Sequence, residues 1–258
     1  MANQGSPYLI ASVDRAIDLL LILGRSRRDM GVTELARELG VQKSTVHSLL
    51  QTLLGRGFVR QTDGGRYTLG YGLIRLGAAC AEQIDVRSIA RPVMAELAEE
   101  TQEVALLAVL SGHELTIIDK VEPQRPFLII PKFDFSITLH STAIGKVLLA
   151  NAPPAVLEMV LQQGMERFTP YTLTDREALL AEMARVRAQG FAVGCNETIE
   201  GLTCIAVPIR DAAGNVAAAL SVSSASSVLV PERFPAVTRV LKAKAEVISR
   251  RLGHDPAF

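Results

Sequence analysis

Six polar side chains lie close together in the N-terminal third of the chain, and their types suit contact with a nucleic acid. They are Gln42, Lys43, Ser44, Thr45, His47 and Ser48. Gln and Ser side chains can reach base edges in the major groove, and a lysine at a helix N-terminus can meet phosphate. Arg37 lies just before this group and can approach phosphate, and Arg66 follows it where it could touch the backbone or the minor groove. The alternative is a small helical bundle that packs against another protein.

A second group of chemical interest lies in the segment LHSTAIGKVLLA, residues 139–150. Ser141 or Thr142 is placed to cap a helix, and the first free N–H groups of that helix would form an anion site. The segment is not a P-loop, because His140 replaces the first glycine of GxxxxGK[ST] and Val147 replaces the final Ser/Thr. The alternative is an ordinary capped helix.

Two later apolar segments, 202–209 and 216–223, flank a turn-rich sequence and predict a β-hairpin. If residue 209 pairs with 216, Cys204 lies opposite Ser221 and Leu202 lies opposite Ser223. One face of the hairpin is then small and weakly polar and leaves room for a ligand, whereas the other suits packing against a helix. The alternative is that the small side chains let a helix approach closely.

Catalysis has little support in the residue types. A nucleophilic Cys204 or Ser221 would need a base, and the chain has only four histidines and no GxSxG, HExxH or GxGxxG motif. The polar loop with Asn196, Glu197 and Glu200 is interpreted as surface. Three cysteines without a CxxC predict neither a zinc site nor a disulfide framework. We therefore predict no catalytic residue, no metal ligand and no cofactor, with an enzyme carrying a DNA-binding extension left as an alternative.

The elements that must position these residues follow from periodicity and turn signals. Helices are predicted at 12–23, 33–39 and 44–54, strands at 58–61 and 66–69 around Asp63, Gly64 and Gly65, and a connecting helix at 71–83. Helix, turn, helix and a two-stranded hairpin is the order of a winged helix-turn-helix.

The rest of the chain alternates between helices and strands. Helices are predicted at 85–100, 142–150, 154–162, 175–189 and 232–252, and strands at 104–110, 115–121, 127–130, 202–209 and 216–223. This mixture favours an α+β fold over a doubly wound sheet.

Composition is consistent with two folded parts. The 258 residues are 48% hydrophobic and carry no net charge. Residues 1–83 contain ten Lys/Arg and seven Asp/Glu, a net charge of +3 that leaves −3 for the remainder, which permits a polyanionic partner at the N-terminal part. The start lacks the features of a signal peptide, and no long uncharged apolar stretch occurs, so we expect a cytoplasmic protein without a membrane partner.

Several segments together resemble the IclR family of transcriptional regulators over nearly all of residues 10–252. They are SVDRAIDLL, TELARELGVQKSTVHSLLQTL, GRYTLG, LHSTAIGKVLLA and EGLTCIAVPIRDAAGNVAAALSVS. The resemblance implies a GAF-like C-terminal domain with a curved antiparallel sheet flanked by helices, which binds a small organic acid or related metabolite. It also implies double-stranded operator DNA as a partner and a homodimer or a dimer of dimers.

Carried over by position, the resemblance implies effector-binding residues in three segments. They are Thr142, Ala143, Ile144, Cys204, Ser221 and Ser223, with Leu128 and Ile130 as apolar neighbours. Two departures stand out. Ser48 occupies a position that is often Arg in the family, and Gly194 replaces an acidic residue of some relatives, which indicates a less polar pocket. The expected domains are 1–70, the winged helix-turn-helix; 71–88, a linking helix; and 89–258, the effector-binding domain.

Overall fold

The computed structural model describes residues 9–82, 85–124 and 138–256. They form two compact units, one that ends at Ile84 and one that runs from Asp85 to Pro256, and each is described by itself. The expected boundaries at residues 70 and 88 stay a prediction. Among the described helices, none combines the length and apolar character that a membrane span requires.

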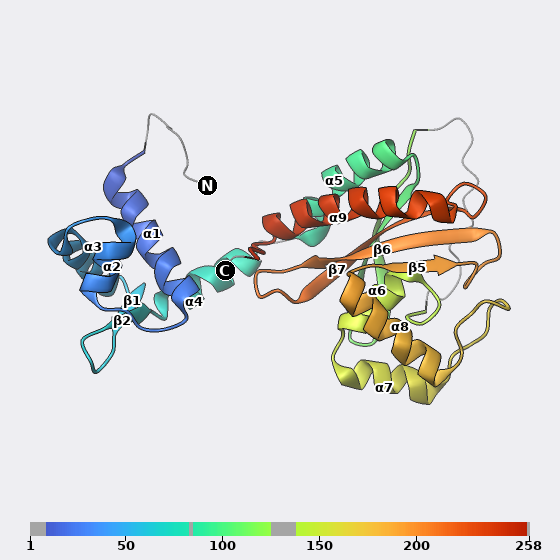
Figure 1. Ribbon diagram of the computed structural model, residues 1–258, viewed down its shortest axis with the longest axis horizontal. Coiled ribbons are helices and arrows are strands. Elements are labelled where there is room, and N and C mark those ends of the chain that lie inside the picture. Colours follow the sequence, from blue (N-terminus) through green and yellow to red (C-terminus); the bar gives the residue numbers. More distant parts are fainter. Residues whose placement is uncertain (1–8, 83–84, 125–137, 257–258) are drawn as a thin grey trace. The chain divides into compact units, whose positions relative to one another are not determined.

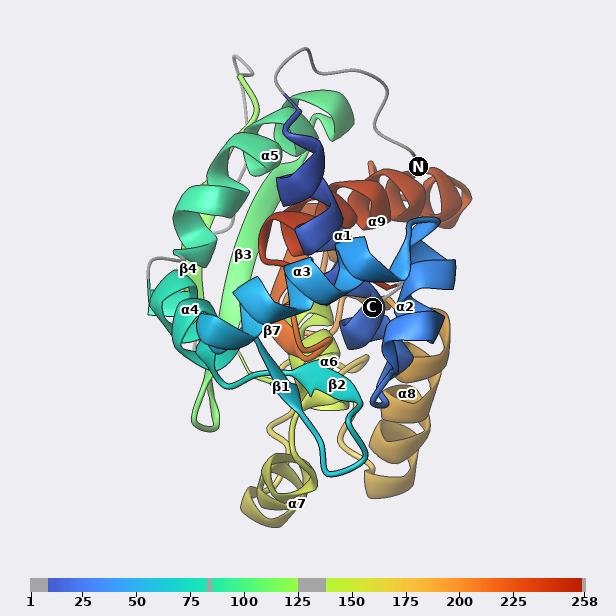
Figure 2. The same ribbon diagram turned by 90° about the vertical axis from the view of Figure 1, so that its left-hand side faces the viewer.

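The N-terminal unit contains the predicted helices and hairpin, with ends that differ by one or a few residues from the expected ones. Its elements are α1 (Ala11–Ser26), α2 (Val32–Leu39), α3 (Lys43–Gly55), β1 (Val59–Gln61), β2 (Tyr67–Leu69) and α4 (Gly72–Glu82). Figure 2 shows α2 and α3 following each other and leading into the β1–β2 hairpin.

The α2–α3 turn depends on Gly40, which ends α2 in a left-handed backbone conformation (φ 65°). Residues other than glycine rarely adopt this conformation. The two helices and α1 share one apolar core. Leu19, Leu35, Val46 and Leu50 are fully buried in it. This packing fixes α3 and leaves its other side to solvent.

The C-terminal unit is a five-stranded antiparallel sheet of order β4-β3-β7-β6-β5 with helices on both faces. Its elements are α5 (Val86–Thr101), β3 (Val104–Ser111), β4 (Glu114–Val121), α6 (Ala143–Asn151), α7 (Pro154–Gln163), α8 (Arg176–Gln189), β5 (Ala192–Cys195), β6 (Leu202–Arg210), β7 (Val216–Ala225) and α9 (Phe234–Arg251), the last preceded by a short turn of 3-10 helix at Pro231–Arg233. The α+β prediction is thus confirmed. The expected strand 127–130 lies outside the described residues.

Alternation along the strands creates two cores on the two faces of the sheet. On one face, α5 and α9 pack on Ile205, Val207, Leu220 and Val222. On the other face, α6 and α8 pack on side chains that include Leu106, Ala206 and Ala219. Figure 1 shows α5 and α9 on one side of the sheet and α6 and α8 on the other.

The expected register of the β6–β7 hairpin is wrong by two residues. Cys204 pairs with Ser223 instead of Ser221, because a bulge after Ile209 and a loop closed by Asp211 and Asn215 lengthen the turn. A shift by two residues leaves every side chain on its face, whereas a shift by one would have exchanged the faces. The faces are therefore divided as predicted, but helices pack on both of them: α6 approaches the small face closely, as the alternative stated, and leaves space only beside its N-terminus.

Strand β5 is absent from the sequence-based expectations, and it forms the edge of the sheet beside β6. The strand has four residues and includes Gly194, a residue type that strands disfavour. Its pairing with β6 brings Gly194 opposite Cys204. The edge strand thereby joins the small face that was predicted from β6 and β7 alone.

Candidate functional site

The residues predicted to meet DNA lie at the start of α3 and along its solvent side. Gln42 is the N-cap of the helix, and its side chain and those of Lys43, Ser44, His47 and Ser48 are exposed, with Thr45 half-buried. Val46 and Leu50 on the opposite side are buried. The structure brings the six positions together as expected, and their contact with DNA stays a prediction.

Two of the cations near this surface are available to an anion. The side chains of Lys43 and Arg37 are exposed, and neither makes an ion pair or hydrogen bond within the described part of the chain. Ser48, in contrast, turns its hydroxyl back to its own helix and donates to the carbonyl of Ser44 (Oγ to O 3.1 Å). The side chain at this position therefore offers less to a base than a longer one would.

Arg66 is half-buried, and its guanidinium is engaged inside the N-terminal unit. Nη2 lies 2.5 Å from Glu34 Oε2, Nε lies 3.3 Å from Asp29 Oδ1, and Nη2 also donates to the carbonyl of Asp29 (3.1 Å). These contacts tie the hairpin to the start of α2. We therefore infer that Arg66 positions the hairpin, and its own contact with DNA stays a prediction.

Glu34, the acidic partner of Arg66, also makes a hydrogen bond to the backbone at the start of α2. Its Oε2 accepts a hydrogen bond from the backbone N–H of Gly31 (2.9 Å), which closes the start of α2. This backbone hydrogen bond first, and then the contact with Arg28, lower the pKa of Glu34 to about 2. The carboxylate is charged at any physiological pH and keeps Arg66 in place.

A small cavity of about 40 Å³ lies between the small face of the sheet and the N-terminus of α6. All six described residues that the sequence assigned to effector binding line it, namely Thr142, Ala143, Ile144, Cys204, Ser221 and Ser223. Leu128 and Ile130 lie outside the described residues. The cavity exists where the sequence placed it, and its ligand stays a prediction.

One end of the cavity presents hydrogen-bond donors. Thr142 caps α6 by accepting from the N–H of Gly145 (3.0 Å) and donates its own hydroxyl to the carbonyl of Thr138 (3.0 Å). The N–H groups of Ala143 and Ile144 begin the helix and have no intrahelical acceptor. Ser223 is 95% buried, and its hydroxyl faces the Cys204 thiol and has no other partner among the described residues.

Two glycines fit the backbone closely around this end. A Cβ at Gly145 would lie 2.6 Å from both the carbonyl of Thr138 and the hydroxyl of Thr142, so no side chain fits there. A Cβ at Gly194 would lie 3.2 Å from the backbone nitrogen of Ala143. Gly194 therefore leaves the first N–H of α6 uncovered.

Cys204 lies in the cavity wall as a neutral thiol. Burial raises its pKa to about 11, and a smaller lowering effect comes from the Ser223 hydroxyl. A thiol with this pKa is a poor nucleophile at neutral pH. Cys204 is therefore a packing and weak hydrogen-bonding group in the cavity.

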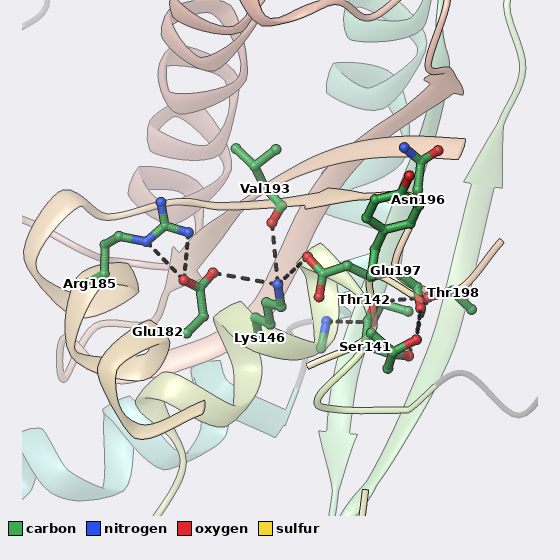
Figure 3. A network of polar contacts seen from close by, with 12 residues as sticks. Ser141, Thr142, Lys146, Glu182, Arg185, Val193, Asn196, Glu197 and Thr198 are labelled. Carbon is green, nitrogen blue, oxygen red and sulfur yellow. Dashed lines mark hydrogen bonds and ion pairs between the residues drawn. The ribbon is translucent and has the colours of Figure 1, made fainter. Parts of the chain in front are cut away.

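Lys146, one turn into α6, is the centre of a buried charge network that the sequence did not indicate (Figure 3). Its side chain is 2% exposed, and its Nζ lies 2.5 Å from Glu197 Oε1 and 3.5 Å from Glu182 Oε1. Glu182 also binds Arg185, whose Nη2 lies 2.5 Å from Oε2. The two cations and two carboxylates balance each other, which makes the burial of Lys146, Glu182 and Glu197 possible, whereas Arg185 is exposed.

Glu197 therefore corrects the expectation of a surface loop. Its side chain is 11% exposed and lines the cavity, and burial raises its pKa although the Lys146 ammonium opposes the rise. Its Oε2 has no hydrogen-bond partner within the described residues. A lysine inside an otherwise apolar helical segment was the available signal, because a buried ammonium requires a carboxylate.

The described residues contain no cluster of His, Cys, Asp and Glu that could hold a metal ion. His140, the histidine beside the cavity segment, is buried, and its Nε2 lies 3.0 Å from the carbonyl of Glu166. Burial lowers its pKa, so it is neutral. It is thus held as a structural group next to the cap of α6.

Comparison with known proteins decides the family. Residues 12–63 match the IclR helix-turn-helix domain, and residues 78–250 match the bacterial transcriptional regulator IclR C-terminal domain. The chain belongs to the IclR family of bacterial transcriptional regulators. The transcriptional regulator XynR of Escherichia coli K12 is 34% identical over 248 residues, which cover 95% of this chain and 98% of XynR.

Solved structures agree with this assignment. An IclR transcriptional regulator from Silicibacter sp. TM1040 matches with a TM-score of 0.84 and 30% identity over 96% of this chain and 99% of its own. An IclR homolog from Microbacterium hydrocarbonoxydans, crystallised with 4-hydroxybenzoate, matches with a TM-score of 0.58 and 27% identity over 93% of this chain and 98% of its own. The chain is accordingly a helix-turn-helix transcriptional regulator and not an enzyme, and the family resemblance read from the sequence is confirmed.

Proposed function

We propose that this IclR-family regulator binds operator DNA through α3 and changes its operator affinity when a small carboxylic acid occupies the cavity beneath α6. The observation that carries the proposal is the donor end of the cavity, where the N-terminus of α6 and the buried hydroxyl of Ser223 face a largely apolar space. Free helix N–H groups and the helix dipole favour an anion. The bound 4-hydroxybenzoate of the Microbacterium homolog is a carboxylate and supports this class.

The operator-binding form is a homodimer in this proposal, and two dimers can associate further. Val13, Ile17 and Leu21 form an exposed apolar stripe along α1 at helical spacing, and Ile74 and Leu76 are exposed on α4. Exposed apolar rows of this kind favour association between copies. A symmetric dimer would bind a palindromic operator in the cytoplasm, and the regulated genes would serve metabolism of the acid.

The DNA-binding half is tested by fluorescence anisotropy of the full chain on its own upstream DNA at several salt concentrations. Lys43→Ala should weaken binding to all sequences and reduce the salt slope by about 1, because one phosphate contact is lost. Arg239→Ala is the matched control, because Arg239 is an exposed cation of the C-terminal unit. Salt-insensitive or absent operator binding by the wild type would overturn the proposal and favour a protein-binding sensor with a degenerate DNA module.

The sensing half is tested by a thermal-shift screen of organic acids, since a ligand of the native state raises the melting temperature. An acid that raises it should also change the anisotropy-derived operator affinity, because the two equilibria are linked. Ser221→Ala combined with Cys204→Ala should spare operator binding and reduce the response to the acid. An unchanged response in that variant would show that the effector binds elsewhere.

A further inference from the structure

We propose that Glu197 selects effectors that carry a hydroxyl group as well as a carboxylate, by accepting a hydrogen bond from that hydroxyl at Oε2. The proposal rests on the proposed function, because it narrows the class of acid that the cavity takes. It assigns to Glu197 a specificity-determining contact with the ligand. The carboxylate of the effector would lie at the donor end, against α6 and Ser223, and its hydroxyl would point toward Glu197.

The two kinds of polar group in the cavity match the two groups of such a ligand. The N-terminus of α6 and Ser223 supply donors, whereas Glu197 supplies the one carboxylate among the described residues that line the cavity. Glu197 Oε1 is taken by Lys146 at 2.5 Å, and Oε2 has no partner in the described chain. A buried acceptor without a donor is costly, so a ligand that donates to Oε2 removes that cost.

The donor on the ligand must be neutral. Lys146 already holds Glu197, and Arg185 already holds Glu182, so the two carboxylates are matched by two cations. An ammonium at Oε2 would add a third positive charge close to the buried ammonium of Lys146, with few water molecules to screen it. A hydroxyl donates the same hydrogen bond without that charge. Hydroxy acids are therefore favoured over amino acids of the same skeleton.

The size of the cavity limits the carbon skeleton. One water needs about 10–15 Å³ of such space, so a cavity of about 40 Å³ holds about three or four groups of that size. Acids of about two to four carbons fit this space without rearrangement. The remaining wall is apolar, with Leu106, Ile117 and Leu202 among its residues, which suits a short hydrocarbon skeleton between the two polar ends.

The experiment compares acids that differ in one substituent. Isothermal titration calorimetry on the full chain measures affinities for glycolate, acetate and glycine, and for lactate, propionate and alanine. In the wild type the hydroxy acid of each set should bind about tenfold or more tightly than the parent acid, because the parent leaves Oε2 unpaired. The amino acid of each set should bind no better than the parent acid.

Variants then assign the preference to Glu197. Glu197→Met should remove the preference, so that hydroxy and parent acids bind within about threefold of each other. Glu182→Met is the matched control, because Glu182 also contacts Lys146 but does not line the cavity, and it should keep the preference. Circular dichroism verifies folding. If Glu197→Met does not fold, the double variant Lys146→Met/Glu197→Met removes the acceptor without leaving a buried lysine unpaired.

The outcomes separate this proposal from the proposed function. Equal affinities of hydroxy and parent acids in the wild type, or a preference that persists in the Glu197 variants, would overturn the role of Glu197 and leave the acid-sensing function intact. Tighter binding of the amino acids would overturn the requirement for a neutral donor. Absence of binding by every acid of both sets would also overturn the proposal, and the broader thermal-shift screen would then decide whether the cavity binds acids at all.

Discussion

Replacing Lys146 with Met removes one charge from a buried network and keeps most of the side-chain volume. Glu182 retains Arg185 at 2.5 Å, so Glu197 is the group left without a cation. Its side chain is 11% exposed, too little for water to replace the ammonium. We expect Glu197 to take up a proton in the folded variant instead of remaining charged, because a lone buried carboxylate shifts its pKa upward.

The magnitude follows from that protonation. A carboxyl group with an ordinary pKa of 4.5 takes up a proton at pH 7 at a cost of about 3.4 kcal/mol, and at pH 5 at a cost of about 0.7 kcal/mol. Lys146→Met should therefore lower the free energy of unfolding by up to about 3 kcal/mol at pH 7 and by less than about 1 kcal/mol at pH 5. In this variant the pKa of Glu197 is higher in the folded protein than in the unfolded chain. The contribution of Glu197 to the free energy of unfolding is therefore largest below pH 4.5 and falls as pH rises through the folded pKa.

Urea unfolding followed by far-ultraviolet circular dichroism at pH 5, 6 and 7 measures this difference. The double variant Lys146→Met/Glu197→Met is the control, and it should recover the wild-type free energy to within about 1 kcal/mol, because a buried ion pair and a well-packed apolar pair are of similar stability. A loss of equal size at pH 5 and pH 7 would refute the reasoning, since it would assign the effect to packing. No loss at pH 7 would refute the burial of the network.

Four further predictions concern other residues. Arg66→Met should loosen the hairpin and weaken operator binding without reducing its salt slope, which anisotropy titrations would detect as a uniform loss; a reduced slope would show that Arg66 meets phosphate. The pKa of about 2 for Glu34 means that its contribution to stability is present above pH 4.5 and is lost as pH falls toward 2, so Glu34→Gln should flatten the acid limb of a thermal-melt series. Gly145→Ala should lower the free energy of unfolding by about 2 kcal/mol or more, because its Cβ would meet two oxygens at 2.6 Å, and an unchanged urea midpoint would contradict this. A maleimide at pH 7 should label the exposed Cys80 well before Cys204, whose pKa of about 11 lowers its thiolate fraction about a hundredfold relative to a pKa of 9.0, and equal rates would show that the wall of the cavity opens freely.

The parts of the fold that sequence predicted are those that local pattern controls. The buried stripe with Val46 and Leu50 required α3, and Gly40 required a helix end, because each signal lies within a few residues of its effect. The register of β6 and β7 depended on one bulge after Ile209, which no local pattern indicates. The small face was still predicted, since a shift by two residues preserves the pleat.

The polar contacts that the sequence missed or misplaced all join residues that are far apart in the chain. Arg66 is 32 residues from Glu34, and Lys146 is 51 residues from Glu197. From residue type alone, an arginine in the hairpin is predicted to contact DNA and a glutamate in a loop is predicted to be exposed to solvent, because charged side chains usually lie at the surface. Only the fold shows that each of these charged side chains has a partner inside the protein. That partner is the reason to assign each side chain a structural contribution.

The two carboxylate oxygens of Glu197 differ in their hydrogen-bond partners. Its Oε1 has Lys146, which accounts for the burial of a charge, but its Oε2 has no donor within the described residues. The hydroxyl of Thr198, on the same loop, is directed to Ser141 and does not donate to this oxygen. In our proposal the effector supplies the missing donor to Glu197 Oε2, and its carboxylate supplies an acceptor to the hydroxyl of Ser223.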